Sequence, residues 1–295
     1  MKKSILLAGL FLMAASCSSD ESVNTVDGAE SFAPVTVSVE GFSIAQGDIP
    51  VTRAATALAD YSAIKFVTLA FYRSDGSEAY KHTQVKEDGT TYTTFGEFSC
   101  NLPLGSYTMV VLCNEGDNAI TLSSPTSATY GEQKVMDTFA ATQEVNITSN
   151  NAVSLTATLN RIITAIAVRS TDNRPNDVTQ IRITYSGGDK SFNPSTGFAV
   201  NNNGFVCVLG FGSAGGSPTN IGSYLFLASD EQNVDVVVEM LNDDGDVLYR
   251  RSAENVPLKR NRVTSLTGTL FSNTGVSSSS FQVNKDWDTG YNMNF

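Results

Sequence analysis

The residue types that could support catalysis are few, and the sequence does not group them. His82 is the single histidine, so any nucleophile–histidine mechanism would have to use it, and nothing in the sequence places a serine or cysteine near it. Ser62 and Lys65 have the S-x-x-K spacing of a serine-acylation motif. They lead into a strand pattern instead of opening a helix, and the companion S-D-N and K-T-G motifs are absent. We therefore predict that the chain is not an enzyme.

Metal and phosphate sites lack their usual spacing as well. The acidic run 243–246 does not follow the alternating D-x-D-x-D-G ligand order of a calcium loop, so we interpret it as a hairpin turn. The glycine-rich stretch 210–222 lacks the lysine and the following helix of a phosphate-binding loop. An odd number of cysteines makes a poor disulfide framework, so Cys100, Cys113 and Cys207, all in apolar runs, are expected to be buried free thiols. The sequence leaves open whether any of them form a disulfide, and it predicts neither a metal nor a cofactor.

The N-terminus carries the pattern of export and lipid attachment. Residues 1–16 have a basic start, a short apolar core and small residues at the end, which is typical of a secretory signal peptide too short to span a membrane. The small residues followed by Cys17 look like a lipobox, although Ala14 stands where leucine is usual. The serine and acidic residues 18–21 resemble the surface-export signal of Bacteroidota lipoproteins. We expect palmitate-type acylation of Cys17, anchoring in the cell outer membrane and a flexible tether over 17–33; the alternative is a plain exported thiol.

Arg53 has the surroundings of a proteolytic site. It stands alone among small residues, with Ala54 directly after it. The segment before it, Pro34 to Ile44, alternates apolar and polar residues, which predicts a strand with one buried face. Cleavage after Arg53 would free residues 34–53 and leave an open groove with unpaired edges that another strand could fill. The alternative is an ordinary first strand followed by an ordinary loop arginine.

The composition indicates a globular β protein. The 295 residues are 41% hydrophobic and 17% charged, and long helical periodicity is absent. A net charge of -11 argues against nucleic acid and anionic membrane surfaces as partners. Short strand patterns separated by turns predict an all-β fold of two antiparallel sandwiches, each with about seven strands. We place them at 54–158 and 159–295.

The C-terminal end is unusually apolar for a terminus. Two alternating runs occupy it, separated by Thr289 and Gly290. Chain ends are usually polar and frayed, so an apolar end must pack on something. The residues alone leave open whether that surface belongs to its own domain or to another chain. The apolar or aromatic residues of the two runs include Phe281, Val283, Trp287, Tyr291 and Phe295.

Several segments, taken in order, resemble the fimbrillin family, the type V pilins of Bacteroidales. They are the lipobox start, VTRAA after a first strand, PLGSYTMVVLCN, LNRIITAIAV and VPLKRNRVTSLTGTLF. The resemblance covers nearly the whole mature chain. It implies two tandem transthyretin-like antiparallel β-sandwich domains and a fimbrial subunit that supports cell adhesion and assembles by donor-strand exchange.

Carried onto this sequence, the resemblance implies processing between Arg53 and Ala54 by an arginine-specific protease. It implies that the tail 278–295 is the donor strand, with Phe281, Val283, Trp287, Tyr291 and Phe295 as its anchors. The implied partners are other copies of the chain, other fimbrial subunits and, before cleavage, the outer membrane through the lipid on Cys17. The processed chain would then belong to an extracellular fimbrium.

The presence of both a cleavage site and a donor tail indicates a stalk subunit. An anchor or tip adhesin would lack one of these two features. A monomeric glycan-binding surface lipoprotein would present clustered exposed aromatics, and the predicted loops contain no such cluster. These alternatives make different predictions about assembly after cleavage.

Overall fold

The computed structural model describes residues 30–43, 58, 64–86, 94–212, 214–272 and 281–288, with side chains for all of these except 41–43 and 282–288. These residues form nineteen strands and no α-helix. The all-β prediction is therefore confirmed for this part of the chain. None of the described segments is a helix long and apolar enough to cross a membrane.

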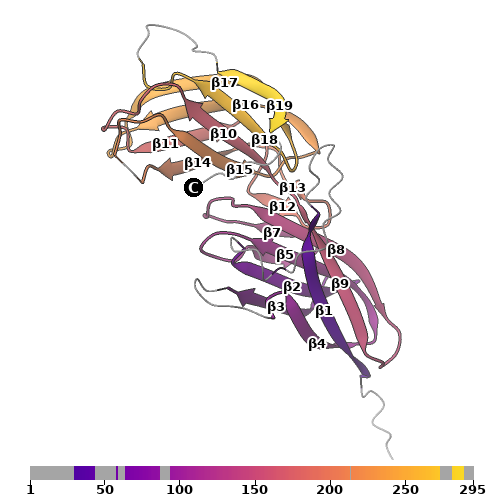
Figure 1. Cartoon of the computed structure of the whole chain (residues 1–295). Helices are drawn as coiled ribbons and strands as arrows, with labels where there is room; N and C mark the ends of the chain where they lie inside the picture. The colour runs from indigo at the N-terminus through magenta and orange to yellow at the C-terminus, as the bar shows by residue number, and fades with distance from the viewer. Residues whose placement is uncertain are drawn as a thin grey trace, which may run out of the picture. The chain divides into compact units, whose positions relative to one another are not determined.

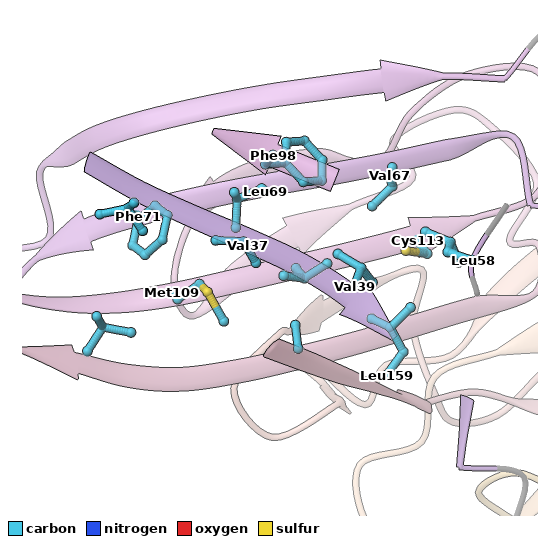
Figure 2. Packing of buried hydrophobic residues seen from close by; sticks show 14 of the residues in the cluster. Val37, Val39, Leu58, Val67, Leu69, Phe71, Phe98, Met109, Cys113 and Leu159 are labelled. Carbon is cyan, nitrogen blue, oxygen red and sulfur yellow. The ribbon is translucent and has the colours of Figure 1, made fainter. Parts of the chain in front are cut away.

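The first sandwich, as we call it, contains seven strands in the order β3-β2-β5-β8-β9-β1-β4. Its layers are β3-β2-β5-β8 and β9-β1-β4, and they are joined where β8 and β9 pair over only two residues at their ends. Apolar side chains from both layers fill the space between them (Figure 2). The strands are β1 (Phe32–Ser43), β2 (Phe66–Arg73), β3 (Glu78–Val85), β4 (Glu97–Pro103), β5 (Gly105–Asn114), β8 (Thr138–Ile147) and β9 (Val153–Arg161).

The second sandwich has two sheets, β15-β10-β18-β19 and β14-β11-β16-β17 (Figure 1). A second core cluster draws its side chains from both sheets, including Ile166 and Leu266 on one side and Ile183 and Val238 on the other. The strands are β10 (Thr164–Ser170), β11 (Gln180–Tyr185), β14 (Phe205–Gly210), β15 (Asn220–Leu225), β16 (Glu231–Leu241), β17 (Val247–Lys259), β18 (Val263–Gly268) and β19 (Gln282–Asp288).

A small sheet connects segments from the two halves. Its order is β13-β12-β7-β6, where β6 (Thr121–Ser124) and β7 (Ser127–Thr129) precede β9 and β12 (Ser191–Asn193) and β13 (Phe198–Ala199) follow β10. The polar sequence of 115–133, rich in Gly, Ser and Thr, predicts a loop, and this prediction is wrong for β6 and β7. Both strands are too short and too rich in hydroxyl residues to show an apolar period.

A third core cluster lies on the outward face of β2 and β5. Tyr72 and Leu112 pack there with Tyr130, Phe192 and Phe226, and the rings of Phe192 and Phe226 stack with centroids 4.1 Å apart. Both faces of β2 and β5 are therefore buried. This accounts for their nearly continuous apolar sequences, since a strand buried on both faces has no reason to alternate.

The two sandwiches repeat one topology. In each, the first strand pairs antiparallel with the fourth and parallel with the seventh: β1 lies between β4 and β9, and β10 lies between β15 and β18. β19 is an eighth strand, present in the second sandwich. The other sheet repeats as β3-β2-β5-β8 and β14-β11-β16-β17. The prediction of purely antiparallel sheets is wrong at these two parallel pairs, because alternation identifies the buried face of a strand but not the direction of its neighbours.

Candidate functional site: the first and last strands

The strand β1 is inserted between two others. It runs antiparallel to β4, with Val37 opposite Phe98, and parallel to β9, with Val37 opposite Leu155. Ala33, Val35, Val37 and Val39 all point inward and are between 0% and 3% exposed. The predicted one-sided strand at Pro34 to Ile44 is confirmed for the described residues, and β1 is a central strand of its layer.

The inward side chains of β1 close one side of the first core. In Figure 2, Val37 and Val39 point from β1 into the space that also holds Leu69, Met109 and Leu159. Adjacent strands lie about 4.8 Å apart. Removal of β1 would therefore leave a gap about two strand spacings wide, with an apolar floor and free hydrogen-bonding edges on β4 and β9.

The middle of the outward face of β1 carries Thr36 and Ser38, which are small and neutral, between the exposed Phe32 and Glu40. Thr36 Oγ1 donates a hydrogen bond to Ser154 Oγ at 3.2 Å, and Ser38 Oγ donates one to Glu97 Oε1 at 2.8 Å. Both contacts are exposed to water, where a hydrogen bond contributes little net stability. The strand is therefore held mainly by its backbone pairing and its four inward side chains.

Arg53 and Ala54 lie outside the described residues. The chain is described again at Leu58, which is 1% exposed and belongs to the first core. Gly96 lies against it: a Cβ on Gly96 would be 3.1 Å from Leu58 Cδ2, and φ at Gly96 is +94°. Cleavage after Arg53 would thus leave Leu58, a residue anchored beside the end of β1, at the start of the processed chain.

The last described strand belongs to the second sandwich. β19 pairs antiparallel with β18, with Val283 opposite Leu266. Phe281, directly before it, is 7% exposed and packs in the second core. Val283 and Trp287 lie within β19, whereas Tyr291 and Phe295 lie outside the described residues, as does Cys17. The structure therefore pairs part of the predicted donor tail within its own chain and does not bring it to β1.

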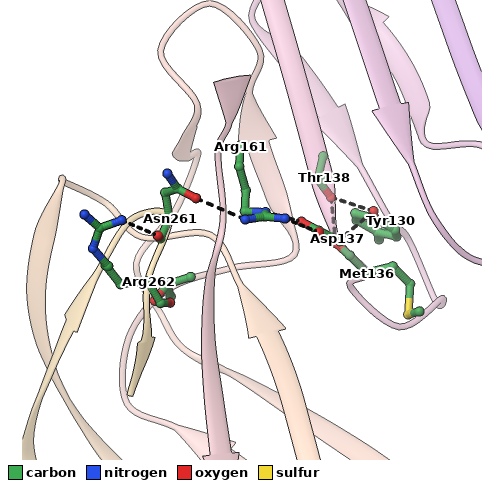
Figure 3. Close-up of polar contacts among 8 residues, drawn as sticks. Tyr130, Met136, Asp137, Thr138, Arg161, Asn261 and Arg262 are labelled. Atoms are coloured by element: carbon green, nitrogen blue, oxygen red, sulfur yellow. Dashed lines mark hydrogen bonds and ion pairs between the residues drawn. The ribbon is translucent and has the colours of Figure 1, made fainter. Parts of the chain in front are cut away.

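A polar cluster that the sequence did not reveal joins Arg161, at the end of β9, to Asp137 and Asn261. Arg161 forms a two-point ion pair with Asp137, with Nε–Oδ1 at 2.8 Å and Nη2–Oδ2 at 2.9 Å. It also donates to Asn261 Oδ1 at 3.3 Å, so β9 is linked to the turn before β18 (Figure 3). The only sequence signal was the arginine in LNRI, and its partner Asp137 stands in no motif.

Burial shifts the pKa values of two carboxyl groups in this cluster. Burial and the nearby Asp137 carboxylate together raise the pKa of Glu115 to about 7, while Arg161 opposes the shift. The pKa of Asp137 is raised by burial as well, although the charge of Arg161 and its hydrogen bonds lower it in part. In the described part of the chain, no three or more His, Cys, Asp or Glu side chains are placed to hold a metal ion.

Comparison with known proteins gives a family and a fold. Residues 33–294 match the family of unknown function DUF6562. A candidate polysaccharide-binding protein (DUF1812) from Bacteroides thetaiotaomicron VPI-5482 is similar in structure, with a TM-score of 0.51 at 12% identity, over 88% of this chain and 98% of that one. No curated protein matches the chain. At this identity the likeness shows the fold alone.

Two further solved structures are similar at lower scores. A candidate adhesin from Bacteroides ovatus ATCC 8483 has a TM-score of 0.47 at 13% identity, covering 82% of this chain and 88% of that one. The fimbrial anchor protein Mfa2 from Porphyromonas gingivalis has a TM-score of 0.45 at 10% identity, covering 80% and 90%.

Proposed function

The chain belongs to the family of unknown function DUF6562, and from the arrangement of its first strand we propose that it is a structural, non-enzymatic subunit of a surface fimbria that supports cell adhesion. The subunit has two transthyretin-like sandwiches. It is exported as a precursor with lipid on Cys17 and anchored in the outer membrane. An arginine-specific protease cleaves it after Arg53, and it then assembles with other copies and other fimbrial subunits in the extracellular fimbrium.

The observation that carries this proposal is the position of β1. A single strand near the N-terminus, bordered on both sides and followed by a lone arginine, can be freed by one cut between Arg53 and Ala54. Burying each inward valine contributes roughly 1.5–3 kcal/mol. Losing Val35, Val37 and Val39 together therefore removes an amount comparable to the total stability of a domain, about 5–15 kcal/mol. A chain without β1 has a strong drive to accept another strand.

The tail 278–295 of a neighbouring copy is the strand that refills the groove. Among the described strands of the single chain, β19 pairs with β18 alone, whereas the site of β1 offers two edges, on β4 and β9. Backbone groups on a free edge of β19 would gain a second partner by the transfer, and backbone pairing is the source of affinity in strand addition. Phe281, Val283, Trp287, Tyr291 and Phe295 supply the side chains that set the register.

Treatment of the purified full chain with an arginine-specific protease tests the proposal. We expect cleavage after Arg53, loss of the first strand and a ladder of oligomers on a gel. The Arg53→Ala chain should fold and give no ladder under the same treatment. A ladder of oligomers from the Arg53→Ala chain, or a cleaved wild-type chain that gives no ladder at high concentration, would contradict the role of β1.

One structural observation favours a second candidate, a non-polymerising anchor or tip subunit. Phe281 is buried in the core of its own sandwich and β19 belongs to its sheet, so the tail could serve only its own domain. Truncation after Ser280 separates the two roles. A folded, cleavable chain that cannot extend oligomers is expected of a stalk subunit, whereas unfolding of the second sandwich assigns the tail to its own chain.

A further inference from the structure

The strand β14 is an unprotected edge of the second sandwich. Among the described strands it pairs only with β11. Its sequence FVCVLG has no charge and no proline, and the whole stretch 191–229 contains no Asp, Glu, Lys, Arg or His. Val206 and Val208 are 49% and 45% exposed on its outward face. Natural edge strands usually carry lysine, proline or a bulge that prevents further pairing, and β14 has none of these.

The free backbone groups of β14 can be assigned from its pairing with β11. Phe211 N donates to Thr179 O at 2.9 Å, and in this register Cys207 lies opposite Ile183. Hydrogen-bonded and non-hydrogen-bonded pairs alternate along an antiparallel ladder. Cys207 therefore bonds toward β11, and the N–H and C=O groups of Val206 and Val208 point away from the sheet.

We propose that β14 pairs antiparallel with β14 of a second copy, about a two-fold axis at Cys207. The sequence around Cys207 has the same apolar character in both directions, with valine at 206 and 208 and large apolar residues at Phe205 and Leu209. In this register Val206 lies opposite Val208 of the other copy, and the outward backbone groups of both residues bond across the axis. The contact is isologous, as a two-fold dimer requires.

The charge distribution permits a second copy at this edge. A copy carries the same net charge of -11, so close approach is opposed wherever acidic surfaces would meet. β14 itself carries no charge, and the charged residues that line the cleft beside it, Asp117, Glu132 and Lys134, include both signs, so two copies can pair there with little of that repulsion. Other edges differ: β3, for example, presents Lys81 and Glu78, which form an ion pair on its surface.

In this pairing the two Cys207 residues lie close enough to form a disulfide. They form a non-hydrogen-bonded pair, whose Cα atoms lie about 4.5 Å apart, inside the range of about 4.4–6.8 Å that a disulfide spans. Cys207 and Leu209 line a cleft of about 490 Å³ together with Gly222 and Tyr224. The residues of the second copy that lie opposite Cys207 and Leu209 project from the same face of the paired strands, so their side chains can enter this cleft.

The test uses the full chain with Cys17→Ser and Arg53→Ala, so that neither lipid nor strand exchange contributes. Sedimentation equilibrium should show a reversible dimer. Mild oxidation, which takes two electrons and two protons from a thiol pair, should link Cys207 to Cys207 as mapped by mass spectrometry. Val206→Lys should weaken the dimer by about tenfold or more. The matched control Val85→Lys replaces a 51% exposed valine on the edge strand β3 and should leave the dimer unchanged.

Moving the thiol tests the register. The double variant Cys207→Ser with Val206→Cys should lose most cross-linking, because position 206 faces position 208 of the other copy. Equal cross-linking at 206 and 207 would show random collision and overturn the proposed pairing. A chain that remains monomeric, or a dimer that Val85→Lys weakens as much as Val206→Lys, would overturn it as well. These outcomes are independent of whether cleavage at Arg53 triggers assembly.

Discussion

Replacing Val37 by alanine measures how far β1 supports the first sandwich. Val37 is 1% exposed and lies in the middle of the strand, opposite Phe98 on one side and Leu155 on the other. The change removes two methyl groups, worth about 0.8 kcal/mol each in transfer free energy, and leaves a cavity that adds to the cost. We expect Val37→Ala to lower the free energy of unfolding by about 2–3 kcal/mol.

Thr36→Ala is the matched control on the opposite face of the same strand. Thr36 is exposed, and its one hydrogen bond, to Ser154 at 3.2 Å, is open to water. The control should change the free energy of unfolding by no more than about 0.5 kcal/mol. Both values come from urea unfolding of the uncleaved chain followed by far-ultraviolet circular dichroism, with the slope checked to be the same in each variant.

Equal effects of the two substitutions would refute the reasoning. They would mean that β1 contributes no more through its inward valine than through its solvent face. The groove left by its removal would then have no driving force to capture another strand. The proposal of assembly by strand replacement would lose its energetic basis even if cleavage at Arg53 occurred.

Further predictions concern the polar cluster, the tail and the N-terminus. The pKa of Glu115 in the folded chain, about 7, lies above its value in an unfolded chain, about 4.3. The contribution of Glu115 to the free energy of unfolding should therefore be fully present below about pH 4 and be lost as the pH rises through 7. Glu115→Gln should remove this contribution to the pH dependence in urea titrations and raise the free energy of unfolding at pH 8 by about 1–2 kcal/mol, a value reduced for the partial exposure of the side chain. Arg161→Met should leave Asp137 buried without its partner and cost about 3–5 kcal/mol in the same assay, and a smaller loss in the chain that also carries Asp137→Asn would confirm the pairing. Phe281→Ala should cost about 3–5 kcal/mol in the single chain, because its ring lies in the second core; no loss would show that the residue is available for another chain. Cys17→Ala should abolish palmitate labelling of the precursor, and labelling equal to wild type would rule out that residue as the acceptor.

The elements that the sequence predicts well are those with a local physical cause. Asp75-Gly76 between two strand patterns predicts a hairpin, and Phe66–Arg73 and Glu78–Val85 form one, with φ +82° at Gly76 in its turn. The side chain of Asp75 accepts a hydrogen bond from Ser77 N at 2.8 Å, which accounts for the Asp-Gly signal. The alternation in β1 likewise reports its burial, because each second residue must face the core.

The elements that the sequence predicts poorly depend on distant partners. Nothing in the sequence of β1 indicates that its parallel neighbour is β9, more than a hundred residues later. The apolar tail signalled a need for packing, but the choice of β18 as a partner for β19 depends on which edge the fold leaves open. Asp137 is invisible for the same reason, since its role arises only when β9 brings Arg161 beside it.

The two sandwiches share one strand order but differ in whether cleavage of one peptide bond can release their first strand. The same order occurring twice in one chain is the pattern that tandem duplication of one seven-stranded unit leaves. β10 occupies in the second unit the position that β1 occupies in the first, but the chain continues from β10 into the fold on both sides, to β9 and to β11. One broken peptide bond on the C-terminal side of β1 separates it from every later strand. A cut between β10 and β11 leaves β10 attached to β9, and a cut between β9 and β10 leaves it attached to β11. Connectivity alone therefore allows a single cut to release the first strand of the repeated unit in the first sandwich but not in the second.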